Sequence, residues 1–171
     1  MALRTIIKYP NPRLRIIAEE IKVLGEDIKI LAEDMAETMY KSNGIGLAAT
    51  QIDVHKQMIV VDVSTKKDSL YTLINPKIIE KKGRVEVEEG CLSVPDIVAT
   101  VSRAEYIKIE TLNLRGEKKY IEATEILAVC IQHEIDHLKG VVFVDYLSRL
   151  KRDRIAKRLA KLDRVVSHDQ S

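Results

Sequence analysis

The sequence of 171 residues is poor in cysteine and lacks long apolar runs, and each of these shortages excludes a class of protein. It holds only two cysteines, Cys91 and Cys130, so a disulfide framework is excluded and a reducing compartment is expected. No apolar run approaches the roughly 20 residues of a membrane-spanning helix. The N-terminus lacks the apolar stretch and small-residue cleavage site of a signal peptide. We therefore expect a cytoplasmic protein that does not act in a membrane.

An excess of charge of one sign is also missing from the chain as a whole. The net charge is +2, which gives no indication of sequence-specific nucleic-acid binding. Residues 149–164 are the exception, because they carry a net charge of +6. We predict a basic C-terminal helix over residues 147–166, with one apolar stripe formed by Leu150, Ile155, Leu159, Leu162 and Val166. Its basic face is either solvated or attached to a polyanion.

The remaining sequence has no repeats or linkers, so we expect a single domain over residues 1–171. Apolar residues at helical spacing predict a helix from about residue 26 to 43. Alternating β-branched residues between about 57 and 122 predict mostly antiparallel strands. A helix over about 125–138 follows, capped by Thr124 and ended by Gly140, and residues 141–146 are expected to be extended. This order predicts an α+β fold, in which antiparallel sheets pack around a central helix between N-terminal and C-terminal helices.

The stretch QHEIDHLKG, residues 132–140, places the pattern H-E-x-x-H on the predicted central helix. His133 and His137 lie one turn apart on the same face, so both can bind one metal ion. Glu134 is close enough to act on a water molecule at that ion. The alternative is a pair of solvated histidines on an amphipathic helix. A hydrolytic metal site also needs a third protein ligand and one open position.

The third ligand distinguishes between kinds of site. The metzincin pattern would need a histidine at position 143, where Phe143 stands, and no glutamate follows Glu134. Cys91 is favoured because it stands in EEGCLSVP, where a glycine and a proline flank the end of a predicted strand. The other candidates are Cys130, better explained as an apolar group, His55 and His168, which we expect at the surface, and Asp145.

Three stretches together resemble the signature motifs of peptide deformylases: GIGLAATQ (residues 44–51), EGCLS (89–93) and QHEIDHLKG. Their order and spacing fit, and the likeness covers nearly the whole chain, as in the bacterial type with a C-terminal helix. It implies removal of the N-formyl group from the initiator methionine of nascent polypeptides, with release of formate. It also implies one divalent metal ion held by Cys91, His133 and His137, typically Fe²⁺, with Zn²⁺, Ni²⁺ or Co²⁺ as substitutes.

The resemblance gives further residues a role. Glu134 would act as general base and acid, and the Gln51 amide and the Leu92 backbone N–H would stabilise the oxyanion. Substrate-binding positions would be Gly44, Ile45, Gly46, Val87, Gly90, Ile126, Val129 and Cys130, although Val87, Ile126 and Val129 could equally belong to the core. In the family the C-terminal helix is associated with docking on the ribosome.

Charged residues near the motifs have two interpretations. Glu89, Arg103 and Asp136 either orient the metal ligands or form exposed salt bridges. Val98 stands where some deformylases carry an arginine near the mouth of the groove, so that contribution to peptide binding is in doubt here.

Other functions remain open on the sequence alone. GIGLAA is similar to a dinucleotide-binding fingerprint, but it follows a predicted helix instead of a strand, which disfavours phosphate binding. We expect a flexible turn there, whose glycines allow a close approach of backbone. A metallopeptidase of the H-E-x-x-H type is the second hypothesis, and a non-enzymatic protein with a closed structural metal site is the third.

Overall fold

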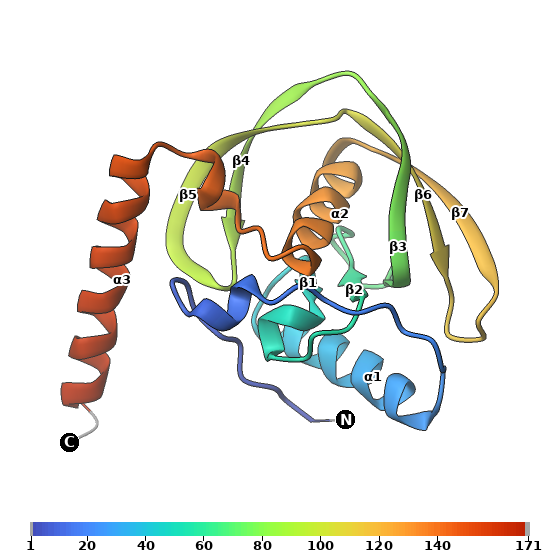
Figure 1. Cartoon of the computed structure of the whole chain (residues 1–171), viewed down its shortest axis with the longest axis horizontal. Coiled ribbons are helices and arrows are strands. Elements are labelled where there is room, and N and C mark those ends of the chain that lie inside the picture. Colours follow the sequence, from blue (N-terminus) through green and yellow to red (C-terminus); the bar gives the residue numbers. More distant parts are fainter. Residues whose placement is uncertain (1, 170–171) are drawn as a thin grey trace.

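The structure is a computed structural model that describes residues 2–169, with side chains described as far as Val165 (Figure 1). Seven strands form two sheets, and every strand pairing is antiparallel. The larger sheet has the order β1 (Gly46–Ala48), β2 (Met58–Val61), β3 (Tyr71–Lys82), β6 (Tyr106–Leu112), β7 (Lys118–Thr124). The smaller sheet is a hairpin of β4 (Val85–Cys91) and β5 (Val94–Arg103).

Three α-helices accompany the sheets: α1 (Glu26–Lys41), α2 (Glu125–Leu138) and α3 (Arg149–Asp169). Short 3₁₀ turns are η1 (Pro12–Arg15), η2 (Ala49–Ile52) and η3 (Phe143–Tyr146). Figure 1 shows α2 in the centre, with the β4–β5 hairpin on one side of it and the larger sheet on the other. The predicted α+β fold with mostly antiparallel sheets around the central helix is confirmed. Among the described helices, none is both long and apolar enough to cross a membrane.

The four residues of β2 are all apolar and all buried in the core. Met58 and Val60 face α1, whereas Ile59 and Val61 belong to the cluster that includes α2. The sheet is therefore covered on both faces at this point, which favours continuous hydrophobicity over alternation. Helix α2 contributes Ala128, Ile131, Ile135 and Leu138 to its cluster, at spacings of three and four residues. The helix ends before Gly140, which adopts φ +78°.

The expectation of an extended segment over residues 141–146 was wrong. Phe143–Tyr146 form η3, because the Asp145 carboxylate accepts a hydrogen bond from the Val142 N–H at 3.0 Å and is held by Arg15. This tertiary contact turns the chain and buries Phe143 and Val144 in a third core cluster.

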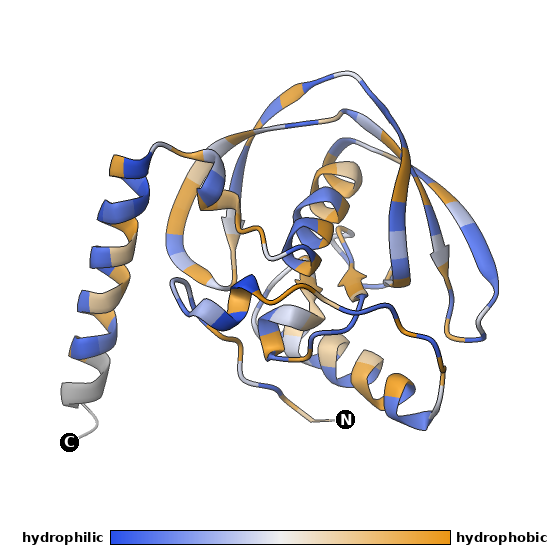
Figure 2. Cartoon of the chain, in the orientation of Figure 1, coloured by the Kyte–Doolittle hydropathy of each residue, from blue (hydrophilic) through white to orange (hydrophobic). Residues whose placement is uncertain are grey.

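The predicted C-terminal helix is present, but it begins at Arg149 and extends to Asp169. Its apolar stripe is only partly covered: Leu159 is 4% exposed in the third core cluster, whereas Leu150 is 63% exposed and Leu162 is 40% exposed. The side chain of Val166 lies outside the part of the chain whose side chains are described. Figure 2 shows hydrophilic residues along much of this helix.

Candidate metal centre and peptide groove

Cys91 ends β4, and His133 and His137 lie one turn apart on α2. The Cys91 Sγ lies 3.3 Å from the His137 Nε2, which lies 3.2 Å from the His133 Nε2. Two nitrogens bound to one ion at about 2.0–2.1 Å, with a tetrahedral angle, would be about 3.3 Å apart. The donor set therefore fits a single metal ion, and these three residues are the one such group among the described residues.

The other candidate ligands do not approach this pair of histidines. Cys130 forms an apolar wall, with its Sγ 3.6 Å from the Ile45 carbonyl oxygen, and burial raises the pKa of its thiol. The His55 ring contacts Asp53 at 2.9 Å, and Asp145 is paired with Arg15. The side chain of His168 lies beyond the described side chains. Within the described residues three candidate ligands converge, and no fourth protein ligand joins them to close the site.

A buried chain of charges holds His133 in place. The His133 Nδ1–H donates to Glu89 at 2.7 Å, which leaves Nε2 directed toward Cys91 and His137. Arg103 donates twice to Glu89, at 2.6 and 2.8 Å, and once to Asp136 at 2.7 Å. Glu89 and Arg103 are only 6% and 7% exposed, so this is a buried network and not an exposed salt bridge.

One member of this network, Tyr146, was not predicted from the sequence; its hydroxyl donates to Asp136 at 2.6 Å. No pattern in the sequence connects these two residues. Burial alone would raise the pKa of Glu89, but its hydrogen bonds from Arg103 and His133 outweigh this effect and lower the pKa to about 2. Glu89 therefore stays ionised as an acceptor for His133.

The two histidines differ in their electrostatics. Burial lowers the pKa of His137 well below its usual value, so this ring is neutral, the form that binds metal. Burial also disfavours charge on His133, but hydrogen bonds to Cys91 and Glu89 outweigh it and raise the pKa. Cys91 and Glu89 would also favour a metal cation beside His133, and such a cation would compete with the proton on the His133 ring.

Glu134 lies beside the candidate ligands but does not belong to the network. Its Oε1 lies 3.6 Å from the His133 Nε2, and its Oε2 is buried without a hydrogen-bond partner among the described residues. Burial is the main cause that raises the pKa of this carboxyl to about 7. A carboxyl with such a pKa can accept and return a proton near neutral pH.

Gln51 lies in η2, where its side-chain Oε1 accepts a hydrogen bond from the Ala48 N–H at 2.9 Å. This contact directs Nε2 toward the metal centre: it donates to the Ser93 hydroxyl at 3.0 Å and lies 3.5 Å from the Cys91 Sγ. Leu92 directly follows Cys91 in the β4–β5 turn. Ser93, which is fully buried, was missed as a contact of Gln51, although it stands within the EGCLS stretch.

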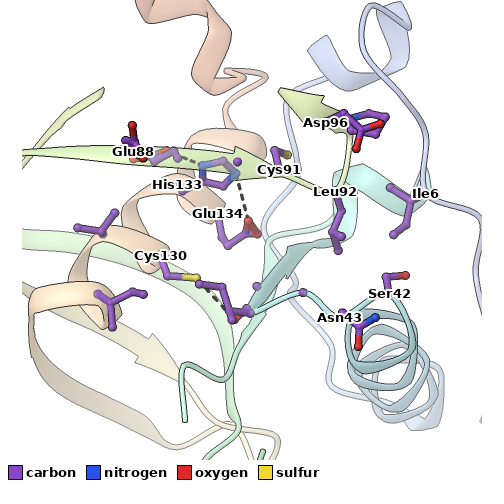
Figure 3. A pocket seen from close by; sticks show the side chains of 18 of the residues that line it. Ile6, Ser42, Asn43, Glu88, Cys91, Leu92, Asp96, Cys130, His133 and Glu134 are labelled. Atoms are coloured by element: carbon purple, nitrogen blue, oxygen red, sulfur yellow. Dashed lines mark hydrogen bonds and ion pairs between the residues drawn. The ribbon is translucent and has the colours of Figure 1, made fainter. Parts of the chain in front are cut away.

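A cavity of about 570 Å³ opens in front of these residues. Figure 3 shows Cys91, His133 and Glu134 near its middle, with Cys130 toward one end and Leu92, Ile6 and Asp96 toward the other. All the predicted substrate-binding residues except one line it: Gly44, Ile45, Gly46, Gly90, Ile126, Val129 and Cys130. Val87 lines a neighbouring hollow with Val129 and Tyr106 instead.

Two strands leave a backbone edge at the cavity. Among the described strands, β1 pairs only with β2, and β4 pairs only with β5, while residues of both line the cavity. The flexible turn expected at GIGLAA, residues 44–49, was wrong, because Gly46–Ala48 form the strand β1 and Ala49 begins the buried turn η2. Gly46 allows a close approach, since a Cβ there would lie 2.7 Å from the Cys130 Sγ.

A Cys/His/His ligand set, a buried carboxylate beside it and an adjoining cavity define a metal-dependent hydrolase. The family model described as polypeptide deformylase matches residues 3–153, and the chain belongs to that family. As a member, it removes the N-formyl group from the N-terminal methionine of newly made polypeptides.

Curated relatives and solved structures agree with this membership. The peptide deformylase of Buchnera aphidicola subsp. Acyrthosiphon pisum (strain Tuc7) is 51% identical, over 96% of this chain and 95% of the relative. That of Pseudoalteromonas translucida is 50% identical, over 94% and 96%. The crystal structure of a peptide deformylase from Legionella pneumophila has a TM-score of 0.92 at 42% identity, covering 97% of this chain and 98% of the other. That from Ehrlichia chaffeensis in complex with actinonin has a TM-score of 0.93 at 38% identity, covering 96% and 99%.

Proposed function

We propose that Cys91, His133 and His137 hold the metal ion of this deformylase and that Glu134 transfers the proton. The observation that supports this most is the position of Glu134: its Oε1 lies 3.6 Å from the His133 Nε2, and its Oε2 is buried without a hydrogen-bond partner among the described residues. A divalent ion held by these ligands would polarise the formyl carbonyl and make a water molecule more acidic. Glu134 accepts the proton of the attacking water and returns it to the departing amine, so the C–N bond breaks and formate leaves.

The oxyanion that develops at the formyl carbon requires hydrogen-bond donors. We assign the Gln51 Nε2 and the backbone N–H of Leu92 to this role, because Gln51 is held with its amide nitrogen toward Cys91 and Leu92 adjoins the same ligand.

The methionine side chain occupies the apolar end of the cavity, formed by Ile126, Val129 and Cys130. The substrate main chain lies extended between the two free strand edges and pairs with backbone at Ile45, Gly46 and Gly90. Val87 has no part in this proposal, since it lines the neighbouring hollow.

The metal is proposed to be Fe²⁺, with Zn²⁺, Ni²⁺ or Co²⁺ as substitutes. One thiolate and two imidazoles suit late first-row metals of this kind. Metal analysis of protein purified without oxygen tests the assignment. Zinc as the main metal under those conditions would contradict it.

We further propose a cytoplasmic enzyme that meets its nascent peptides at the ribosome through α3. Arg154, Lys157, Arg158 and Lys161 are exposed on this helix, and contacts with phosphates would make binding salt-sensitive. Replacing these four residues by glutamate should abolish cosedimentation with ribosomes and leave formate release unchanged. Unaltered, salt-independent binding would contradict the proposal. This test is sharper than deleting the helix, because Leu159 belongs to the core.

The catalytic assignment is tested with Glu134→Gln. The variant should bind metal normally and lose at least about a hundredfold in formate release from a formyl-Met peptide. Glu125→Gln, an exposed glutamate on the same helix, is the matched control and should remain active. Near-normal turnover in Glu134→Gln would contradict the mechanism. New termini formed from an internal peptide would favour the metallopeptidase.

A further inference from the structure

Residues 7–9 cross the two segments that carry the proposed oxyanion donors. The Ile7 N–H donates to the Gln51 carbonyl oxygen at 2.8 Å, and the Tyr9 N–H donates to the Ser93 carbonyl oxygen at 2.8 Å. The side chains of Ile7 and Tyr9 pack against the third core cluster, whereas Lys8 lines the cavity. The backbone of this segment is thus fixed on both sides of Lys8.

The ammonium of Lys8, an exposed residue, makes one hydrogen bond at the rim of the cavity. Its Nζ donates to the Leu92 carbonyl oxygen at 2.9 Å, and it has no other partner among the described residues. A lysine ammonium has three donors, so two remain for a ligand in the groove.

Lys8 differs from the other charged groups of the groove. It is the single lysine or arginine among the described residues that line the cavity, where the carboxylates belong to Glu88, Glu89, Asp96 and Glu134. Carboxylates repel a carbonyl oxygen, whereas an ammonium donates to it. Val98 is 63% exposed and apolar, so it offers no donor in place of the arginine that some deformylases carry.

We propose that Lys8 binds the substrate main chain beyond the first residue, by donating to a backbone carbonyl oxygen of the extended peptide. The inference rests on the proposed function, because it assigns one more residue to the same peptide. A backbone carbonyl is the chosen acceptor since every nascent chain has one, whatever its side chains. Lys8 then affects substrate affinity more than the chemical step.

The test compares formyl-Met amide with formyl-Met-Ala-Ser amide, whose amidated ends remove any contribution of a terminal carboxylate. Lys8→Met should raise KM for the longer substrate about three- to tenfold, with kcat changed less than about twofold. KM for formyl-Met amide should stay within about twofold of the wild type. Lys8→Arg, which keeps a cationic donor, should restore most of the affinity. Lys66→Met, at an exposed lysine away from the cavity, is the control.

An equal loss for both substrates, or a loss confined to kcat, would overturn the proposal, because Lys8 would then only hold the Leu92 turn. Unchanged KM for the longer peptide would overturn it as well. Metal content and thermal midpoint of each variant separate misfolding from lost contact, and Lys8→Arg gives a second folded variant. If the wild type released no formate from either substrate, the proposed function itself would fail. A failure of the Lys8 assignment alone leaves wild-type turnover intact.

Discussion

Glu89 makes the stability of this protein depend on pH. The carboxylate is buried, accepts two hydrogen bonds from Arg103 and one from His133, and has its pKa lowered from 4.5 to about 2. Because the folded state binds the proton less readily than the unfolded state, ionised Glu89 stabilises the fold. This contribution is present above the unfolded pKa of about 4.5 and is lost as pH falls toward 2.

The magnitude follows from the shift. Each pKa unit corresponds to about 1.4 kcal/mol, so a shift from 4.5 to about 2 contributes roughly 3 kcal/mol to the free energy of unfolding at pH 7. Glu89→Gln removes the charge and leaves Arg103 with an incompletely compensated buried cation. We therefore expect the variant to lose roughly 3–5 kcal/mol at pH 7.

Urea denaturation at pH 7, 5, 4 and 3 measures this difference, with circular dichroism as the probe because the chain has no tryptophan. The gap between wild type and Glu89→Gln should be largest at pH 7 and shrink below about pH 4.5, as the wild type loses the contribution of its carboxylate. Glu86→Gln, at an exposed glutamate of the same strand, should show a small gap that changes little with pH. A gap of less than about 1 kcal/mol at pH 7, or one that is constant with pH, would refute the reasoning.

Three further predictions concern the metal centre. Gly46→Ala should reduce formate release more than about tenfold, since its Cβ would lie 2.7 Å from the Cys130 Sγ and 3.0 Å from the Glu134 Cγ. Normal formate release from this variant would contradict the account. Gly90→Ala, whose nearest neighbour is at 3.6 Å, should keep the thermal midpoint of the wild type. Arg103→Leu should weaken metal binding by about 10–100-fold in a chelator competition, although Arg103 is not one of the three proposed ligands. Unchanged affinity would show that the network does not orient His133. A strong chelator should abolish formate release by the wild type, and added Co²⁺ or Ni²⁺ should restore it. The Cys91→Ser variant should recover only part of the activity with either ion. Full activity after metal removal would exclude the proposed site.

Local spacing predicted those parts of the molecule that depend on local geometry. His133 and His137 face the same way because four residues make about one helical turn, and the alternation of apolar residues located the strands. The partition of the strands into a five-stranded sheet and a separate hairpin has no comparable signature, because it depends on which surfaces pack together. The 3₁₀ turn η3 was missed for the same reason, since a distant arginine holds Asp145.

Val87 was predicted to line the substrate cavity, and its position shows why that prediction could not be made reliably from the sequence. Strand alternation places Val87 on the same face as Glu89, but two residues farther from Cys91. It therefore lies beside the first turn of α2, where it shares a hollow with Glu125 and Val129, instead of beside the proposed metal ligands. The face of the strand could be deduced from the sequence, whereas its position along α2 could not.

The position of Cys91 is decided by the same residues that orient His133. Glu89 on β4 accepts a hydrogen bond from His133, and Arg103 on β5 donates one to Asp136. These two contacts hold the hairpin against neighbouring turns of α2. Arg103 also donates two hydrogen bonds to Glu89, which connects the two strands of the hairpin to each other. Cys91 follows Glu89 by two residues, after an irregularity in the pairing of β4 with β5, and its thiol is thereby set against the helix. One buried carboxylate thus fixes both the ring orientation of one proposed metal ligand, His133, and the location of another, Cys91.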